Sequence, residues 1–340
     1  MRVLVLALAA GVHLAVAAHG APRPLGLSGD GRLVSVGGRI VGHAKLPTRT
    51  LTWAPTGERA AYVTTQGGVV EWTPKGLRRL EPNGWGADWG LAWSASGALA
   101  VSRHDELWVI DGRTAHRVVG PLPPNVGTGG PDIAVPFAWS GNRVLWWDWP
   151  GSGSVAADGV SLYEDNTKLG TTLMYADYTA ACGTHIAFSE GNDRYSTDGK
   201  SLVWDGRIVA GDAHWSWVEP ACTAGGRLLA ARSRDIVPRL TGETHRSIWQ
   251  VLPTRRQLTR PPWGWSDEDP RILPNGDVLF VRSRWHAAGQ TDSQSGRVML
   301  LAHGKLVQVT TIGYTRDFMT DPWAQYYGHY DWSDFLAVQP

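Results

Sequence analysis

The chain has 340 residues, a formal net charge of +1 and 19% charged residues. A protein that tracks the phosphates of nucleic acid needs a strongly basic surface, so this balance argues against nucleic acid as a partner. The 41 Gly and 21 Pro residues favour a turn-rich all-β chain, and the 19 Trp against five Phe require a separate explanation.

The first element along the chain is a hydrophobic leader. Met1-Arg2 is followed by a nearly continuous apolar run from Val3 to Ala18, and Ala15-Val16-Ala17 has the small residues of a cleavage site. The run is too short for a comfortable membrane span, and no later stretch is longer. We therefore expect residues 1–18 to be a signal peptide and the mature chain to be secreted or periplasmic, not membrane-spanning. The alternative is an N-terminal hydrophobic strand.

A module of roughly 40 residues then recurs along the chain, and a repeat of that period made only of short strands is typical of β-propeller blades. Its first half is a short strand, a tight turn and a second apolar strand. Copies of this half begin at Trp53, Trp93, Trp139, Cys182, Cys222, Leu273 and Trp332. Its second half is a hairpin with a Gly-containing turn, of which Asp-Gly is the strongest short signal. Copies of this half lie near residues 69–72, 107–113, 161–163, 201–209, 247–249 and 298–304.

The two ends of the chain carry incomplete modules. Arg32–Val41 reads as a second half without a first half, and Asp331–Val338 reads as a first half without a second half. We expect the two to share one blade, with the C-terminal strands inside and Arg32–Val41 outside, because ring closure removes open sheet edges. The sequence thus predicts one all-β domain, residues 24–340, a propeller of four-stranded blades. Seven blades is the leading count and six the alternative.

The repeat resembles a known family. Trp53-Ala-Pro-Thr-Gly57 and Trp93-Ser-Ala-Ser-Gly97, each followed by an apolar strand, are similar to the WD40-like (PD40) repeat of TolB-like β-propellers. Asp88, Glu219 and Asp269, a few residues before the turn, also match that pattern. Two later copies have Cys in place of the Trp. The family includes periplasmic adaptor proteins, propeller domains attached to peptidases and some lyases, so the resemblance implies a fold and a habit of binding but no single activity.

The two cysteines occupy the same place in successive modules. Cys182 and Cys222 would therefore lie on neighbouring inner strands, and an exported chain favours a disulfide between them. The alternative is a pair of small buried thiols that fill a narrow core.

Two sets of Trp residues recur at positions within the repeat. Recurrence at one position is what packing between blades requires, so we interpret both sets as structural. The anchors are Trp53, Trp93, Trp139 and Trp332, and the third-strand set is Trp72, Trp108, Trp204 and Trp249.

A further set of aromatic residues lies in the links that lead into the inner strands, where the repeat does not demand them. Such links emerge on one face of a propeller, around the mouth of its channel. Flat aromatic faces beside carboxylates bind sugar rings and peptide side chains, although a packed lid would use the same residues. The candidate ligand-binding residues are Trp85, Trp89, Trp215, Trp217, Trp263, Trp265, Asp267, Trp323, Tyr326 and Tyr327.

Catalytic motifs are scarce. The sequence has no Gly-x-Ser-x-Gly and no His-Glu-x-x-His, and we assign no catalytic residue, metal or cofactor. The densest acidic cluster, Asp267-Glu268-Asp269, has the groups for an acid/base pair or a cation. Three histidines, His214, His286 and His329, lie in separate links.

These observations favour an exported, monomeric, non-enzymatic binding or adaptor propeller. Its Trp-rich channel face would engage a protein or a cell-envelope glycan. The alternative is a secreted lyase or glycosidase that uses Asp267, Glu268 or Asp269 with histidines at the channel mouth. A purely structural module of a surface assembly is a third possibility.

Overall fold

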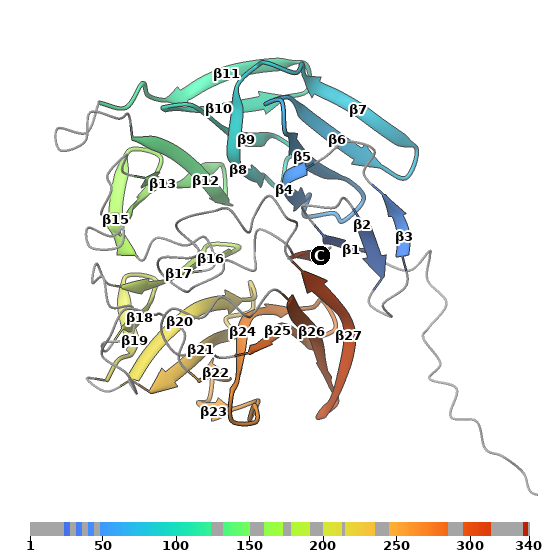
Figure 1. Ribbon diagram of the computed structural model, residues 1–340. Helices are drawn as coiled ribbons and strands as arrows, with labels where there is room; N and C mark the ends of the chain where they lie inside the picture. Colours follow the sequence, from blue (N-terminus) through green and yellow to red (C-terminus); the bar gives the residue numbers. More distant parts are fainter. Residues whose placement is uncertain are drawn as a thin grey trace, which may run out of the picture.

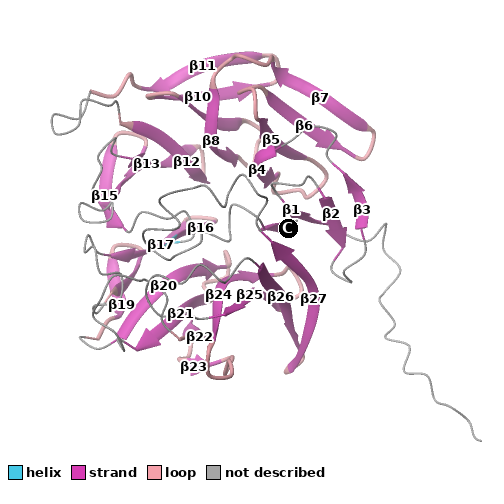
Figure 2. Cartoon of the chain, in the orientation of Figure 1, coloured by secondary structure: helices cyan, strands magenta, loops and turns pink. Residues whose placement is uncertain are grey.

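The structure is a computed structural model. It describes residues 24–27, 32–35, 40–43, 48–123, 132–149, 160–172, 178–190, 200–212, 215–234, 245–284, 295–313 and 336–338. These residues form strands, turns and loops without an α-helix, so none of them offers a helical membrane span (Figure 2).

The strands form five four-stranded sheets and one eight-stranded sheet, set around a common centre (Figure 1). In each sheet the strands pair antiparallel, and the first strand of each consecutive set lies nearest the centre. Two complete sheets come first: β4 (Thr48–Trp53), β5 (Ala60–Thr64), β6 (Val69–Thr73), β7 (Gly76–Glu81), then β8 (Ala87–Trp93), β9 (Leu99–Arg103), β10 (Glu106–Asp111), β11 (Thr114–Val119). Two more close the series: β20 (Trp215–Cys222), β21 (Leu228–Arg234), β22 (Arg246–Leu252), β23 (Arg256–Gln257), then β24 (Trp265–Ile272), β25 (Val278–Arg284), β26 (Ser295–Ala302), β27 (Lys305–Gly313).

The eight-stranded sheet consists of two four-stranded groups. The first group is β12 (Ile133–Ser140), β13 (Arg143–Trp149), β14 (Val160–Glu164) and β15 (Thr167–Thr172); the second is β16 (Thr179–Cys182), β17 (His185–Glu190), β18 (Ser201–Trp204) and β19 (Arg207–Ala210). The single residue pair Thr172↔Glu190 joins them, supported by a hydrogen bond of 2.9 Å from Thr172 Oγ1 to the Ser189 carbonyl. The predicted all-β propeller fold is confirmed by this arrangement.

The two ends of the chain share a sheet of order β28-β1-β2-β3, made of β28 (Leu336–Val338), β1 (Pro24–Leu27), β2 (Arg32–Ser35) and β3 (Ile40–His43). β28 pairs antiparallel with β1 through three residue pairs. The outer strands β2 and β3 lie where we expected Arg32–Val41. The expectation of two inner strands from the C-terminus is wrong, because β1 takes the second place in the sheet. The Trp53 indole also donates a hydrogen bond of 3.2 Å to the Ala337 carbonyl, which ties this sheet to the next.

The turns and outer strands explain why the repeat forms hairpins of this shape. Asp205 and Gly206 both have positive φ (49° and 74°), the geometry of the tight turn that Asp-Gly predicts. Six of the outer strands also contain a bulge at one apolar residue: Val41, Leu80, Val118, Leu169, Val209 and Val309. The two-residue strand β23 pairs without a bulge. A bulge adds a residue and increases the local twist. Leu80, Leu169 and Val209 pack against the cores between sheets.

The anchor tryptophans have the expected structural role. Trp53 and Trp93 are each only 7% exposed in cores between sheets, and the Trp139 indole donates to the Ala92 carbonyl at 2.9 Å. Trp332 lies outside the described residues.

The predicted equivalence of the third-strand tryptophans is wrong in part. Trp108, Trp204 and Trp249 each pair with the second-strand residue two places after the partner of the anchor position, so these three are equivalent. Trp72 pairs with Ala60, the partner of the anchor Trp53 itself, and is therefore displaced by two residues along its strand.

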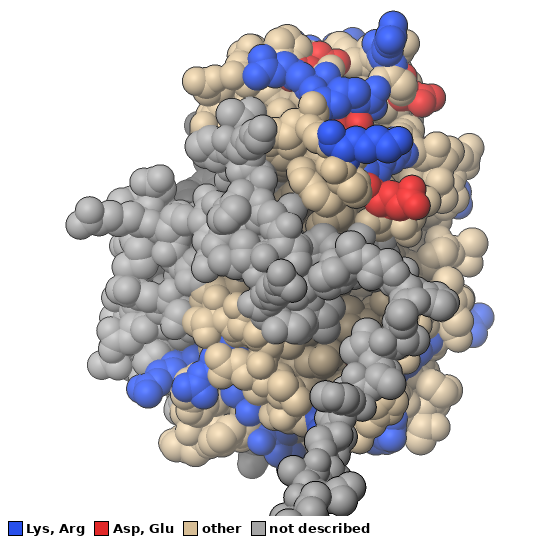
Figure 3. Space-filling view, turned by 90° about the vertical axis from the view of Figure 1, so that its right-hand side faces the viewer, with Lys and Arg blue, Asp and Glu red and all other residues tan. Residues whose placement is uncertain are grey.

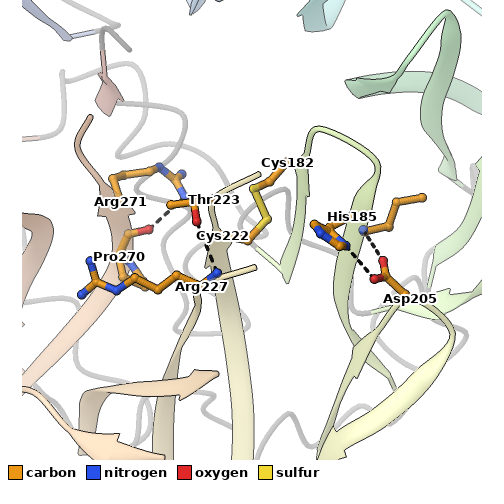
Figure 4. The surroundings of a disulfide bond; sticks show 9 residues. Cys182, His185, Asp205, Cys222, Thr223, Arg227, Pro270 and Arg271 are labelled. Atoms are coloured by element: carbon orange, nitrogen blue, oxygen red, sulfur yellow. Dashed lines mark hydrogen bonds and ion pairs between the residues drawn. A yellow bond between two sulfur atoms is a disulfide. The ribbon is translucent and has the colours of Figure 1, made fainter. Parts of the chain in front are cut away.

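Cys182 and Cys222 form a disulfide, with an S–S distance of 1.97 Å and a Cα–Cα distance of 5.8 Å. They are the last residues of the inner strands β16 and β20. Figure 4 shows the bond crossing between the two strands, with His185 Nδ1 donating to Asp205 Oδ2 at 2.7 Å beside it. The bond therefore joins neighbouring sheets at the end of the inner strands opposite to the Trp-bearing links.

Candidate binding surface

Three tryptophans lie at equivalent points, where the inner strands of three sheets begin. Trp215 and Trp265 are the first residues of β20 and β24, and Trp85 lies two residues before β8. Because every sheet is an antiparallel meander that starts at its inner strand, the starts of these strands lie on one face of the ring. All three side chains are partly exposed.

Each of these tryptophans precedes, by two residues, the inner-strand residue that pairs with an arginine of the second strand. The three register pairs are Ala87↔Arg103, Trp217↔Arg232 and Asp267↔Arg282. The three arginines are thus equivalent, and each has different surroundings.

Arg103 is held against two indoles. Its guanidinium lies 4.7 Å from the ring centroid of Trp85 and 4.9 Å from that of Trp108, which meet edge to face. Arg103 Nε donates to the Trp85 carbonyl at 2.8 Å. Cation–π attraction and this hydrogen bond fix the side chain at the surface.

Arg232 lies among three indoles. Its guanidinium is 3.7 Å from the ring centroid of Trp215 and 4.8 Å from those of both Trp217 and Trp249. Partial burial lowers the pKa of Arg232, and the nearby carboxylate of Asp212 opposes that effect. The side chain remains charged at any physiological pH.

Arg282 is paired within the protein. Its Nε and Nη2 donate to the two carboxylate oxygens of Asp267 at 2.6 and 2.8 Å, a bidentate ion pair. The guanidinium groups of Arg297 and Arg284 instead lie over the Trp265 ring, 4.3 and 5.4 Å from its centroid. Both of these arginines are exposed.

Trp263 is the most exposed large hydrophobic side chain of the described residues, at 71%. It lies two residues before β24 and contacts His245, with ring centroids 5.9 Å apart. His245 Nδ1 in turn donates to the Trp265 carbonyl at 2.8 Å. These contacts place an exposed indole beside the Arg-flanked Trp265.

Two of the predicted ligand-binding residues are buried, which corrects their assignment. Trp217 is 1% exposed and packs in the core with Ala230 and Val251, and Asp267 is 0% exposed under Arg282. Both point inward because they lie one residue pair deeper than the Trp at the strand start. The Trp89 side chain and all of Trp323, Tyr326 and Tyr327 lie outside the described residues.

The acidic cluster is a buried network between two sheets. Glu219, which is 1% exposed, forms an ion pair with the equally buried Arg246 and accepts the backbone N–H of Asp269 at 2.9 Å. Asp269 pairs with Arg271 at 2.6 Å, and Ser283 Oγ donates to Glu268 Oε2 at 3.2 Å. Burial, with Glu268 and Asp269 nearby, raises the pKa of Glu219. Glu219 therefore links β20 to β24.

A pair of carboxylates that sequence reasoning did not connect lies in the sheet of β12 and β13. Asp148 pairs with Ala134, and Asp132 precedes Ala134 by two residues, so the pair occupies the places of Trp215 and Arg232. Burial and the negative charge of Asp132 raise the pKa of Asp148 to about 6, against the weaker effect of Lys168. Aligning the modules by cross-strand register, instead of by Trp, would have brought the two together.

Some of the other charged groups of the described surface form local ion pairs. Figure 3 shows Lys and Arg side chains gathered at the upper end of one side of the molecule, with Asp and Glu among them. Arg78 and Arg59 both bind Glu71, at 2.8 and 3.2 Å. The described residues contain no group of His, Cys, Asp and Glu suited to a metal ion, and His214, His286 and His329 lie outside them.

No protein-family model and no curated protein sequence matches the chain. Solved structures do. The β-propeller domain of Cps50 (Swd1) from Myceliophteria thermophila is 12% identical with a TM-score of 0.50, and the match covers 82% of this chain and 90% of that one. A chain of the mitotic checkpoint complex is also 12% identical with a TM-score of 0.50, over 93% of this chain and 90% of that one. A structure of RRP9 WD40 repeats follows at 12% identity and a TM-score of 0.44, over 86% of each chain. At this identity the two matches with a TM-score of 0.50 show a shared propeller fold.

Proposed function

We propose that this protein is a non-enzymatic binding or adaptor propeller that holds a protein partner against the face where β8, β20 and β24 begin. The observation that carries this proposal is the set of partly exposed indoles Trp85, Trp215 and Trp265, which lie at equivalent places and each have an arginine over the ring. Trp and Arg are the side chains that most often dominate the binding energy of protein interfaces.

The burial of the acidic cluster favours this proposal over a lyase or glycosidase. Asp267 and Asp269 are 0% exposed, and each is bound by an arginine. A general acid or base must come within hydrogen-bond reach of its substrate. A glycan is the second ligand that we keep, because the 71% exposed Trp263 offers a flat face on which a sugar ring stacks.

The wider architecture belongs to the same proposal. Counting the eight-stranded sheet as two blades gives seven blades, one of them shared between the ends of the chain. We further propose that the protein is exported and monomeric, and related to the TolB-like propellers that its repeat resembles. The Cys182–Cys222 disulfide supports export, since such bonds persist in oxidising compartments.

The test compares capture of partners by the wild-type protein and by Trp215→Ala and Trp263→Ala. Ile208→Ala is the control, because Ile208 is 62% exposed on the outer strand β19, away from the proposed face. Proteins crosslinked to each variant in extracts of the producing cells are quantified by mass spectrometry. We expect a partner that the wild-type protein and the control retain and that the Trp variants capture poorly. Each Trp→Ala change should weaken the binding free energy by about 1–3 kcal/mol.

Equal capture by all four proteins would refute the protein-binding proposal. A glycan array with the same four proteins provides the other arm. Binding there that depends on Trp263, without a Trp-dependent protein partner, would identify a glycan-binding propeller instead.

A further inference from the structure

The three equivalent arginines differ in what accepts their hydrogen bonds. Arg103 donates to the Trp85 carbonyl, and Arg282 donates twice to Asp267. Arg232 donates no hydrogen bond to any residue that the structure describes, and its Nε is buried without an acceptor. Among these three, Arg232 alone has its donors unsatisfied.

The residue opposite Arg232 explains this difference. In the neighbouring sheet the arginine faces Asp267, but Arg232 faces Trp217. The indoles of Trp215, Trp217 and Trp249 attract the faces of the guanidinium, as their distances of 3.7 to 4.8 Å show. Stacking does not use the N–H groups, which lie in the plane of the guanidinium and match the two oxygens of a carboxylate.

The charges around Arg232 favour an anionic group. Arg255 lies on the same aromatic cluster, 5.2 Å from the Trp217 ring centroid, and is fixed by a hydrogen bond of 2.8 Å from Nη2 to the Val209 carbonyl. Asp212 is the one acidic group among the described residues whose charge acts on Arg232, and it accepts no hydrogen bond from it. Two cations against one carboxylate leave a local positive excess at the start of β20.

We infer that Arg232 binds a carboxylate of the partner, presented by an acidic peptide segment, through the N–H groups at the end of its guanidinium, because its Nε is buried. This inference rests on the proposed protein-binding function and names the group that the face selects. The three indoles hold the guanidinium in place before the partner arrives, which reduces the entropy lost on binding. A peptide is favoured over an acidic sugar because the proposed function assigns this face, with its Trp and Arg side chains, to a protein partner.

The experiment uses short capped peptides that carry one Asp, and counterparts with Asn at the same place. Binding to the full mature chain is followed by tryptophan fluorescence and by the NMR signal of the arginine Nε–H groups. We expect the wild-type protein to bind the Asp peptide about tenfold more tightly than the Asn peptide, since charge-assisted bidentate bonds are roughly twice as strong as neutral ones. The Arg232 Nε–H signal shifts with the Asp peptide alone.

Arg232→Lys keeps a cation on the indoles but removes the planar fork, so the preference for Asp should fall to near onefold. Arg232→Gln removes the cation and the planar fork, so it should lose the preference as well. Circular dichroism and melting establish that each variant is folded. Arg113→Gln, in the exposed β10–β11 turn, is the control and should keep the full preference. An unchanged preference in a folded Arg232→Lys variant overturns the inference.

A third probe distinguishes the source of the carboxylate. Oligogalacturonate is compared with a neutral galactan on the same variants. Binding of the acidic sugar through Arg232, with no preference for the Asp peptide, overturns the peptide as the occupant. The proposed function is judged separately by partner capture with Trp263→Ala, in which Arg232 is intact.

Discussion

The Cys182–Cys222 disulfide should contribute substantially to stability. The two residues are 40 positions apart, and the chain-entropy model assigns a closed loop of that length about 4 kcal/mol. Because the bond also joins the inner strands of adjacent sheets, its loss should lower the melting temperature by about 6 °C for a chain of this size. We expect this loss in the double variant Cys182→Ala/Cys222→Ala and in the reduced wild-type protein.

Denaturant unfolding of the oxidised protein, the reduced protein and the double variant measures the effect. The double variant is its own control, because reductant should not change its midpoint. If the oxidised protein and the double variant unfold at the same midpoint with the same slope, the entropic reasoning is refuted. Two titratable thiols in the unfolded protein without reductant would refute the bond itself.

Three further predictions concern residues whose burial the structure defines. Trp217→Ala should cost about 3–5 kcal/mol in denaturant unfolding, as a large-to-small change in a core does, whereas Trp263→Ala should change stability by less than about 0.5 kcal/mol; the reverse order would contradict their assignment. Burial raises the pKa of Asp148 to about 6, so its protonated form favours the folded state below pH 3.8 and this contribution is lost as the pH rises through 6. Asp148→Asn should therefore stabilise the protein at pH 8 by about 1–2 kcal/mol, less than the full shift implies because the group is partly exposed, and by nothing near pH 3.5; a gain independent of pH would exclude the carboxylate as its cause. Deleting residues 336–340 removes β28 and exposes the edge of β1, so melting should become less cooperative and light scattering should increase; an unchanged melting curve would show that the C-terminal strand does not close the ring.

The fold was predictable because its signals are local. A Trp before a tight turn and an Asp-Gly between apolar strands each specify a hairpin without reference to distant residues. The matching places of Cys182 and Cys222 predicted their bond for the same reason. The prediction missed the strand β1, whose sequence Pro-Leu-Gly-Leu carries no β-branched residue to mark it as a strand. The displacement of Trp72 along its strand depends on cross-strand pairing, which no single strand records.

The sequence predicted which links between the sheets carry the site, but it did not predict which of their side chains are exposed. Trp215 and Trp217 lie on the same side of β20, and both contact Arg232. Their difference in burial follows from depth along the strand, since the first residue lies at the face of the ring and the third lies within the core. Sequence periodicity places both on one side and cannot rank their exposure.

The chemistry of the face is decided by the residue opposite a repeated arginine. With Ala87 opposite, Arg103 turns to a backbone carbonyl; with Asp267 opposite, Arg282 is neutralised; with Trp217 opposite, Arg232 is stacked and keeps its donors. One substitution per sheet therefore converts a structural ion pair into a candidate receptor for a partner's carboxylate. Putting Asp at position 217 should reverse that conversion, because Arg232 would then find within the chain the acceptor that we assign to the partner. Such a Trp217→Asp protein, if folded, should lose the preference for Asp peptides while Arg232 itself is unchanged, and retention of that preference would show that the opposite residue does not decide it.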